Sequence, residues 1–412
     1  FIQGLGGGGL LSTAQTIIIS AFPPEKLGTA NAIFGMGMIM GPTFGPTLGG
    51  WITDNFSWHW VFFVNIPIGV TAAILAWNYV TDRMGAVKPA RIDYLGILLL
   101  VVAIGSLQFV LEEGTAKDWF ESVEIQIGSV LAVLGLGGFI VRELSVAHPA
   151  VNIRLYANYN LTMGSIMNFL LGLMLFGTVF IFPLFVQISL GWTATKTGMF
   201  MIPGALFTAF SMPLVGAMLN KGINPKVIII AGVLMTFTFL MLLSTSSPDS
   251  SARNFYFPFI LRGMGMAFMM SPILSLAVSG LQGKDMAQAV GLTNMIRQLG
   301  GSFGIALINL FLTQKNAEVR GSMLSYISEF NPIAQDRIAA LTQNYLGRGF
   351  ALPDAQALAN KAMEGFLFRQ QALVSYVQGF FMVGLLILIC IPIVLLVRHS
   401  KKGAAPKVSG GH

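Results

Sequence analysis

Long apolar runs follow one another along this chain, separated for the most part by short loops. Eleven runs are candidate membrane spans, roughly 1–22, 28–51, 58–80, 94–111, 125–142, 159–187, 197–220, 225–246, 255–281, 286–313 and 374–397. Most exceed the roughly 20 residues that a helix needs to cross a bilayer. Charged residues make up 10% of the 412 residues, against about 25% in soluble domains. The sequence therefore predicts an all-α polytopic membrane protein.

Lysine and arginine are unequally divided between the two sets of short loops. One set carries Lys117, Lys196 and Arg253. The other set, with the C-terminal tail, carries Lys26, Arg83, Lys88, Arg91, Arg142, Arg154, Lys221, Lys226, Lys284, Arg398, Lys401, Lys402 and Lys407. Because cytoplasmic loops hold the excess of basic residues, we expect the tail, 398–412, in the cytoplasm. The long segment 314–373 then faces outward.

The run 28–51 is unusually rich in glycine and proline. Its members are Gly35, Gly37, Gly41, Pro42, Gly45, Pro46, Gly49 and Gly50. Gly41, Gly45 and Gly49 are four residues apart, so on a helix they form one stripe that lets another backbone approach closely. Proline is tolerated within membrane helices where neighbouring groups satisfy the freed carbonyls. The stripe on its own fits both a structural contact and a functional one.

An internal repeat relates the first fifty residues to a later part of the chain. A shift of 259 positions, without a gap, aligns Gly4 with Gly263, Gly6 with Gly265, Gly41 with Gly300, Phe44 with Phe303 and Gly45 with Gly304. Two parallel copies of a helix bundle are typical of major facilitator transporters. Three spans precede the repeat unit in the second copy and none in the first, so we expect three further helices upstream of Phe1.

With those helices restored, the layout is six spans, two central spans and six spans. We expect 1–80 to be the remainder of an N-terminal bundle, 81–150 to hold two central helices, and 151–412 to form a C-terminal bundle. The last of these includes the outward segment 314–373 and the tail. This layout resembles the fourteen-helix branch of the major facilitator superfamily.

Local motifs agree with that resemblance. Residues 35–50 resemble the antiporter signature, motif C, of drug–proton antiporters, and FIQGLGGGG at 1–9 resembles the end of the helix-four motif. Residues 58–69 and 111–120 are similar to segments of EmrB-like and QacA-like exporters. The resemblance implies multidrug efflux from a bacterial inner membrane, with the proton gradient as energy source and no cofactor. It also implies a periplasmic adaptor and an outer-membrane channel as partners in a Gram-negative host.

The remaining sequence gives no support to an enzyme or a nucleic-acid-binding protein. A G-x-G-x-x-G pattern at Gly4, Gly6 and Gly9 lacks the preceding strand of a dinucleotide fold. The net charge of +7 is scattered over loops, not gathered in a patch. The possible metal ligands, scattered without metal-site spacing, are His59, His148, His399, His412 and Cys390. We therefore expect no metal site.

Ionisable residues inside a membrane span are costly, and they point to function. Arg297 lies in the middle of the run 286–313, with no easy route to water, and we expect it in the central cavity or beside a buried partner. Arg262 lies nearer the outer end of its run, where its side chain can reach water, and this favours a structural role over a functional one. Glu112 closes the run 94–111, either as a coupling carboxylate or as a solvated loop residue.

The amides within apolar runs are the clearest candidates for a substrate cavity, because an amide in hydrocarbon needs a partner. They are Gln15, Asn168 and Asn294. Phe176 and Phe180, near Asn168, are aromatic candidates for the same cavity. Methionine and aromatic faces suit apolar ligands, although they suit helix packing and lipid contact as well.

These observations favour a secondary transporter for amphipathic or hydrophobic small molecules that works by alternating access. We expect the stripe to pack against 197–220, where Gly204, Ala205 and Ala209 are also small. Two alternatives stay open. An exporter of one metabolite or lipid would use the same scaffold. A non-transporting sensor or scaffold would be marked by an appended soluble domain, and the segment 314–373 is the nearest counterpart to one in this sequence.

Overall fold

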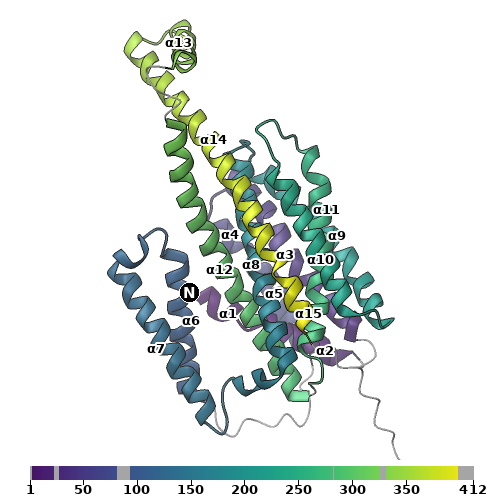
Figure 1. Cartoon of the computed structure of the whole chain (residues 1–412). Helices are drawn as coiled ribbons and strands as arrows, with labels where there is room; N and C mark the ends of the chain where they lie inside the picture. Colours follow the sequence, from purple (N-terminus) through teal and green to yellow (C-terminus); the bar gives the residue numbers. More distant parts are fainter. Residues whose placement is uncertain (1, 23–26, 81–92, 282, 325–330, 398–412) are drawn as a thin grey trace, which may run out of the picture.

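The computed structural model describes residues 2–22, 27–80, 93–281, 283–324 and 331–397. Throughout these ranges the chain is helical or in turns and loops, with no strand (Figure 1). The predicted all-helical membrane fold is confirmed. The helices are α1 (Ile2–Gly7), α2 (Leu10–Ala21), α3 (Leu27–Asn55), α4 (Trp60–Phe63), α5 (Asn65–Tyr79), α6 (Tyr94–Glu113), α7 (Val123–Ser145), α8 (Tyr159–Ile188), α9 (Ala194–Asn220), α10 (Pro225–Ser244), α11 (Arg253–Ala277), α12 (Gly283–Leu324), α13 (Pro332–Gly347), α14 (Leu352–Leu388) and α15 (Cys390–Leu396). Two short 3-10 helices, η2 (Trp119–Glu121) and η3 (Ile153–Ala157), lie in the connections.

The helices follow the predicted apolar runs closely. Nine helical segments of the described residues are long and apolar enough to cross a membrane. The other two predicted spans form α1 with α2, and the 29-residue α3. The largest departure is at 314–373. The predicted spans end at residue 313 and resume at 374, but α12 continues to Leu324 and α14 already begins at Leu352.

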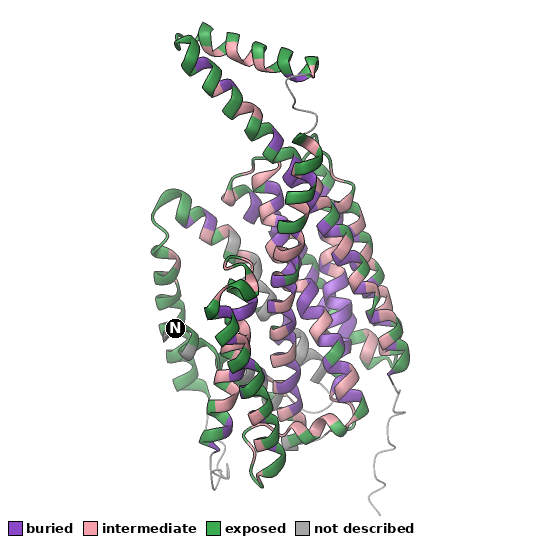
Figure 2. Ribbon diagram, turned by 60° about the vertical axis from the view of Figure 1, so that its left-hand side comes forward, coloured by how far each residue is buried: buried purple, intermediate pink, exposed green. Residues whose placement is uncertain are grey.

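Helices α8 to α12, α14 and α15 form the second half of the protein around one continuous apolar core. Edge-to-face aromatic contacts fill its centre: Phe182 lies 4.6 Å from Phe259 and Phe185 lies 5.4 Å from Phe380, measured between ring centroids. Buried residues concentrate in the middle of the bundle (Figure 2). Asn158, Thr193 and Asn224 begin α8, α9 and α10 by accepting hydrogen bonds from free backbone N–H groups.

Glycines bring α8 and α12 into backbone contact. A Cβ atom at Gly172 would meet the backbone of Arg297, and one at Gly300 or Gly304 would meet the backbone of Phe169 or Leu173. Small residues at such positions allow the close approach on which helix association in lipid depends. The α8–α12 contact thereby fixes the segment of α12 that carries Arg297.

Helix α3 packs along α9, as the sequence analysis predicted for these two runs. The contact uses Gly50, where a Cβ atom would lie 2.8 Å from the backbone carbon of Ala194. At the same end of the interface the hydroxyl of Thr195 donates to Asp54 at 2.7 Å. Toward the other end of the interface, a Cβ atom at Gly35 would lie 2.9 Å from Cε of Met212.

The glycine stripe itself does not make this contact, so that part of the prediction is wrong. Gly41 and Gly45 are exposed, and a Cβ atom at Gly37, Gly41, Gly45 or Gly49 would meet no described atom within 4 Å. The reason is the rotation of the two helices about their axes. Gly204 of α9 faces α11, where its added Cβ would lie 3.1 Å from Phe259. Helix α3 contacts α9 through the face of α3 that does not carry the stripe.

Two helical hairpins leave the bundle. Helices α6 and α7 pack against each other at its side, and α12 also contacts α6. At one end, α12 and α14 continue beyond the other helices and carry α13 at their tip (Figure 1). Arg320 pairs with Glu364 at 3.0 Å and joins the two extended helices. The extension is mostly exposed (Figure 2).

Candidate functional site

A cavity lies where the first-half helices α2 and α3 meet the second half. Its volume is about 20 Å³, room for roughly one water molecule, so the lining side chains lie close together in this conformation. Its lining residues come from six helices and are Gln15, Phe34, Gly35, Asn168, Met212, Met270, Ser271, Leu274, Asn294 and Arg297. Apolar walls with a few convergent polar groups are the usual make-up of a small-molecule site. Four of the polar residues were predicted from sequence: Gln15, Asn168, Asn294 and Arg297.

A hydrogen bond crosses the cavity from one half to the other. The Asn294 amide nitrogen donates to Oε1 of Gln15 at 2.7 Å, and both side chains are buried. An amide in hydrocarbon is stable only when its polar atoms find partners. Each of the two amides therefore satisfies the other only while α2 and α12 stay together.

Two further polar side chains enter the cavity from the second half. Asn168 of α8 donates to the carbonyl of Gly164, one turn earlier on its own helix, at 3.0 Å. Arg297 of α12 is 7% exposed and lies one turn from Asn294. Because Gly172 has no side chain, α8 meets the backbone of Arg297 directly. Among the lining residues Arg297 is the one with a charged side chain.

The internal repeat explains why these residues converge. The shift of 259 positions that aligns the two glycine-rich runs also places Gln15 opposite Leu274 and Gly35 opposite Asn294. All four residues line the cavity. The cavity therefore lies where equivalent parts of the two copies face each other, which is where transporters built from repeats hold their substrates.

The other predicted site residues lie elsewhere. Phe176 packs against Gly301 in the α8–α12 contact, and Phe180 packs against the core of the second half. Arg262 lies over the ring of Phe259 at 5.7 Å, on the side of α11 that faces α9. Glu112 is exposed at the end of α6, where it accepts a hydrogen bond from Gln108. The two phenylalanines follow Asn168 closely in the sequence. They do not line the cavity, because the rotation of α8 about its axis directs them to other neighbours.

The sequence analysis did not identify four lining residues, Phe34, Met212, Ser271 and Leu274. Met212 of α9 lies against Gly35 of α3, and Phe34 is the residue before Gly35. Ser271 and Leu274 lie one turn apart on α11, next to Met270. Met270 belongs to a methionine-rich segment that also holds Met264, Met266 and Met269. The repeat carried a signal for Leu274, because it is the counterpart of Gln15.

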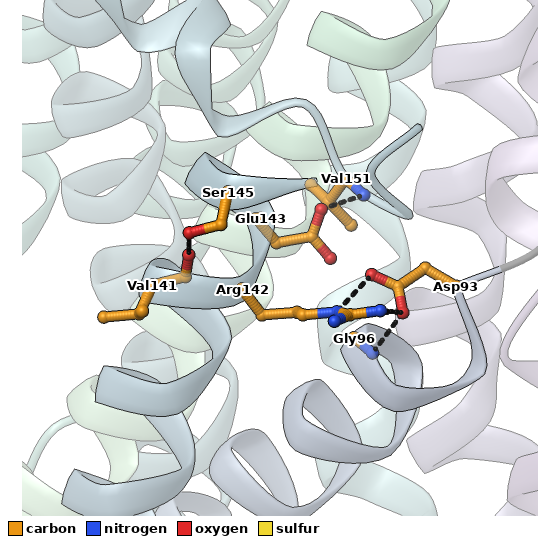
Figure 3. Close-up of polar contacts among 7 residues, drawn as sticks. All are labelled: Asp93, Gly96, Val141, Arg142, Glu143, Ser145 and Val151. Atoms are coloured by element: carbon orange, nitrogen blue, oxygen red, sulfur yellow. Dashed lines mark hydrogen bonds and ion pairs between the residues drawn. The ribbon is translucent and has the colours of Figure 1, made fainter. Parts of the chain in front are cut away.

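A second polar cluster lies outside this cavity, where α6, α7 and the loop before α8 meet (Figure 3). Asp93 begins α6 by accepting from the Gly96 amide at 3.0 Å, and its carboxylate pairs with Arg142 of α7 at 3.1 Å. The hydrogen bond from Arg142, reinforced by that from Gly96, lowers the pKa of Asp93 below its ordinary value. Glu143, the next residue of α7, is fully buried and accepts from the Val151 amide at 3.1 Å.

The described residues contain no group of three or more histidine, cysteine, aspartate or glutamate side chains able to hold a metal ion. The single cysteine, Cys390, is buried in the second half. The polar groups of the central cavity are amides, a hydroxyl and a guanidinium, which bind and orient a small molecule through hydrogen bonds and charge.

Comparison with known proteins places the chain in a family. The model of the Major Facilitator Superfamily matches residues 1–305. The multidrug export protein EmrB of Haemophilus influenzae is 32% identical over 364 residues, which cover 88% of this chain and 70% of that protein. The fatty acid resistance protein FarB of Neisseria gonorrhoeae is 31% identical over 407 residues, which cover 98% of this chain and 78% of that protein. With this match and the helical membrane fold, the chain belongs to the major facilitator superfamily.

Proposed function

We propose that this protein exports amphipathic and hydrophobic small molecules by alternating access, with an inward flow of protons as the energy source. The observation that carries the proposal is the cavity lined from both halves and crossed by the Gln15–Asn294 hydrogen bond. A cavity at the junction of two repeats opens to one side or the other when the halves rock. The similarity to multidrug export proteins supports the same conclusion.

The test is transport by the whole protein in lipid vesicles with an imposed proton gradient. We expect gradient-dependent movement of a fluorescent amphipathic dye, with protons moving in the opposite direction and with both movements abolished by a protonophore. Asn294→Leu removes the amide from the cavity and should reduce transport. The matched control is Asn78→Leu, since Asn78 is exposed and bonds only within its own helix. Dye movement that ignores the gradient would refute proton coupling.

A second candidate substrate is a lipophilic carboxylate, such as a fatty acid. The charge of the cavity comes from Arg297, whose planar guanidinium binds carboxylates in a bidentate manner. The resemblance to a fatty acid resistance protein extends over nearly the whole chain. If carboxylates are the natural substrates, a fatty acid should inhibit transport of a neutral dye more strongly than its methyl ester does. Equal inhibition by the acid and the ester would leave the broader drug-export function as the better description.

We also propose that the C-terminal tail is cytoplasmic and that the α12–α14 extension lies on the opposite side, outside the inner membrane. The distribution of lysine and arginine supports this orientation. A topology reporter fused after Arg320 should then be active outside the cytoplasm, and one fused after Lys402 should be active inside. Reporters that locate both positions on one side would contradict the orientation.

The extension is the part of the protein best placed to meet an adaptor that leads to an outer-membrane channel. Exposed apolar side chains on it include Ile333, Phe350, Leu352 and Phe366. A shallow pocket between α13 and α14 is lined by Ile333, Ala334 and Phe366 among others. We expect replacement of Ile333 and Phe366 by serine to weaken copurification with the adaptor while dye transport in vesicles, which needs no adaptor, stays unchanged. Unaltered copurification would exclude this surface.

A further inference from the structure

Glu143 is a fully buried carboxyl group that the transport cavity does not use. Its Oε2 atom accepts a hydrogen bond from the Val151 amide, whereas its Oε1 atom has no hydrogen-bond partner among the described residues. A Cβ atom added at Gly96 would lie 2.6 Å from Glu143 Oε1 and 2.9 Å from Asp93 Oδ2. The two carboxyl groups therefore approach the same point above the Gly96 Cα atom, where a larger residue would not fit.

The charges around Glu143 do not balance if it is ionised. Asp93, from the start of α6, is already paired with Arg142 through three hydrogen bonds. Arg154 of η3 donates to the carbonyl of Leu144, and His148 in the loop is exposed. An ionised Glu143 would thus be a buried negative charge beside a second carboxylate. Burial of an unpaired charge is unfavourable, whereas a neutral carboxylic acid can be accommodated and can donate its proton.

We propose that Glu143 is a proton-binding site that controls the attachment of the α6–α7 hairpin to the second half of the protein. In the protonated form, Oε1–H supplies a donor for the Asp93 carboxylate while Oε2 holds the Val151 amide, so α6, α7 and the loop before α8 are joined. Loss of the proton leaves two carboxylates facing each other over Gly96. Their repulsion, with the hydration that the ionised group requires, separates the loop from the hairpin.

The position of this site determines which compartment it senses. Residues 146–158 connect α7 to α8, and Tyr159 at the start of α8 donates to the carbonyl of Leu396 at the end of α15. The cluster therefore lies on the same side of the bundle as the end of α15 (Figure 1). This inference does not depend on which substrate the central cavity carries. It assigns to the α6–α7 hairpin a response to pH on the side of the bundle where α15 ends.

The test measures the distance between the hairpin and the second half as pH changes. Spin labels at Val141 of α7 and Val227 of α10, both exposed, report this distance in the whole protein in lipid nanodiscs. We expect one narrow distance distribution at low pH and a second, longer one at high pH. The ratio of the two populations should change about tenfold for each pH unit beyond the midpoint, as it does for a single proton.

Glu143→Gln introduces an amide, which can make the same contacts but does not titrate. The distance between the two labels in this variant should therefore stay short at every pH. Glu113→Gln, which changes an exposed carboxylate at the far end of α6, should behave as wild type. Infrared spectra of the wild-type protein give an independent readout: a carboxylic acid band should vanish with the same midpoint as the distance change. A wild-type distance that is constant with pH, a pH response that persists in Glu143→Gln, or the absence of such a band would each overturn the proposal.

Discussion

Replacement of Gly198 by alanine tests whether the α3–α9 contact holds one side of the transporter closed. A Cβ atom at Gly198 would lie 2.7 Å from Oγ1 of Thr47 and closer still to the Thr47 backbone, whereas ordinary contacts fall at 3.4–4 Å. The overlapped atoms are N, Cα and Oγ1 of Thr47, which belong to the backbone or to the start of the side chain. A change of rotamer therefore cannot relieve the overlap. The helices must separate by about 1 Å, and such overpacking costs about 1–3 kcal/mol.

That cost applies to the state in which α3 and α9 are packed together, and it is absent when the halves separate at this end. Because 1.4 kcal/mol is tenfold in an equilibrium constant, the packed population should fall about 5- to 150-fold relative to the separated one. Spin labels at the exposed residues Asn55 and Met199 report the separation directly. The chain's cysteine, Cys390, is buried and can remain in place.

Gly41→Ala is the matched control. It adds the same methyl group to a membrane helix, but at a position where the added atom would meet no described atom within 4 Å. We expect the wild-type distance distribution in Gly41→Ala and a shift to longer distances in Gly198→Ala. Equal thermal unfolding midpoints would show that the shift is not general unfolding. If Gly198→Ala retains the wild-type distance, the contact does not limit separation of the halves.

Three further outcomes are expected. Arg297→Ala should abolish proton-coupled transport in vesicles while Arg297→Lys, which keeps the charge but not the planar fork, retains part of it; equal rates at equal expression would make the arginine structural. In a double-mutant cycle, Gln15→Leu and Asn294→Leu should each destabilise the protein by about 1–3 kcal/mol, because each leaves one buried amide unpaired, and the double variant should cost less than the sum; strict additivity would show that the bond is not formed. Asp93 has a lowered pKa in the folded protein, so its contribution to the free energy of unfolding is present at neutral pH and is lost as pH falls through that pKa. The difference in unfolding temperature between wild type and Arg142→Gln should therefore shrink below about pH 4. A difference that stays constant with pH would contradict this.

Much of the architecture could be predicted from sequence because the bilayer imposes a length on every span. The runs 159–187 and 225–246 match α8 and α10 to within about two residues at each end, the usual uncertainty of helix ends. The division into the remainder of an N-terminal bundle, two central helices and a C-terminal bundle stays a prediction. The continuation of α12 to Leu324 was missed because its polar residues read as loop by hydropathy, although a helix outside the bilayer is free to be polar.

The site could be predicted in part, because polar residues are easy to recognise within apolar membrane spans. Gln15, Asn168, Asn294 and Arg297 stood out against apolar runs, and all four line one cavity. Facing directions could not be derived in the same way. The even hydrophobicity of a membrane helix gives no marked polar face from which to orient it, so Phe176 was expected in the cavity although it packs against Gly301. The Asp93–Arg142–Glu143 cluster was missed because it depends on contact between residues 49 positions apart.

The continuous course of α12 has a mechanical consequence. The helix runs without proline from the cavity into the extension, and from Arg297 to its end at Leu324 it covers about 40 Å at 1.5 Å per residue. A tilt of about 10° at the cavity would swing that end through about 7 Å. The extension thus acts as a lever that enlarges a small movement around Arg297 into a large one beyond the membrane. For the same reason, a molecule bound at the tip of the extension would oppose the movement at the cavity. Its affinity for the tip should then depend on what the cavity holds.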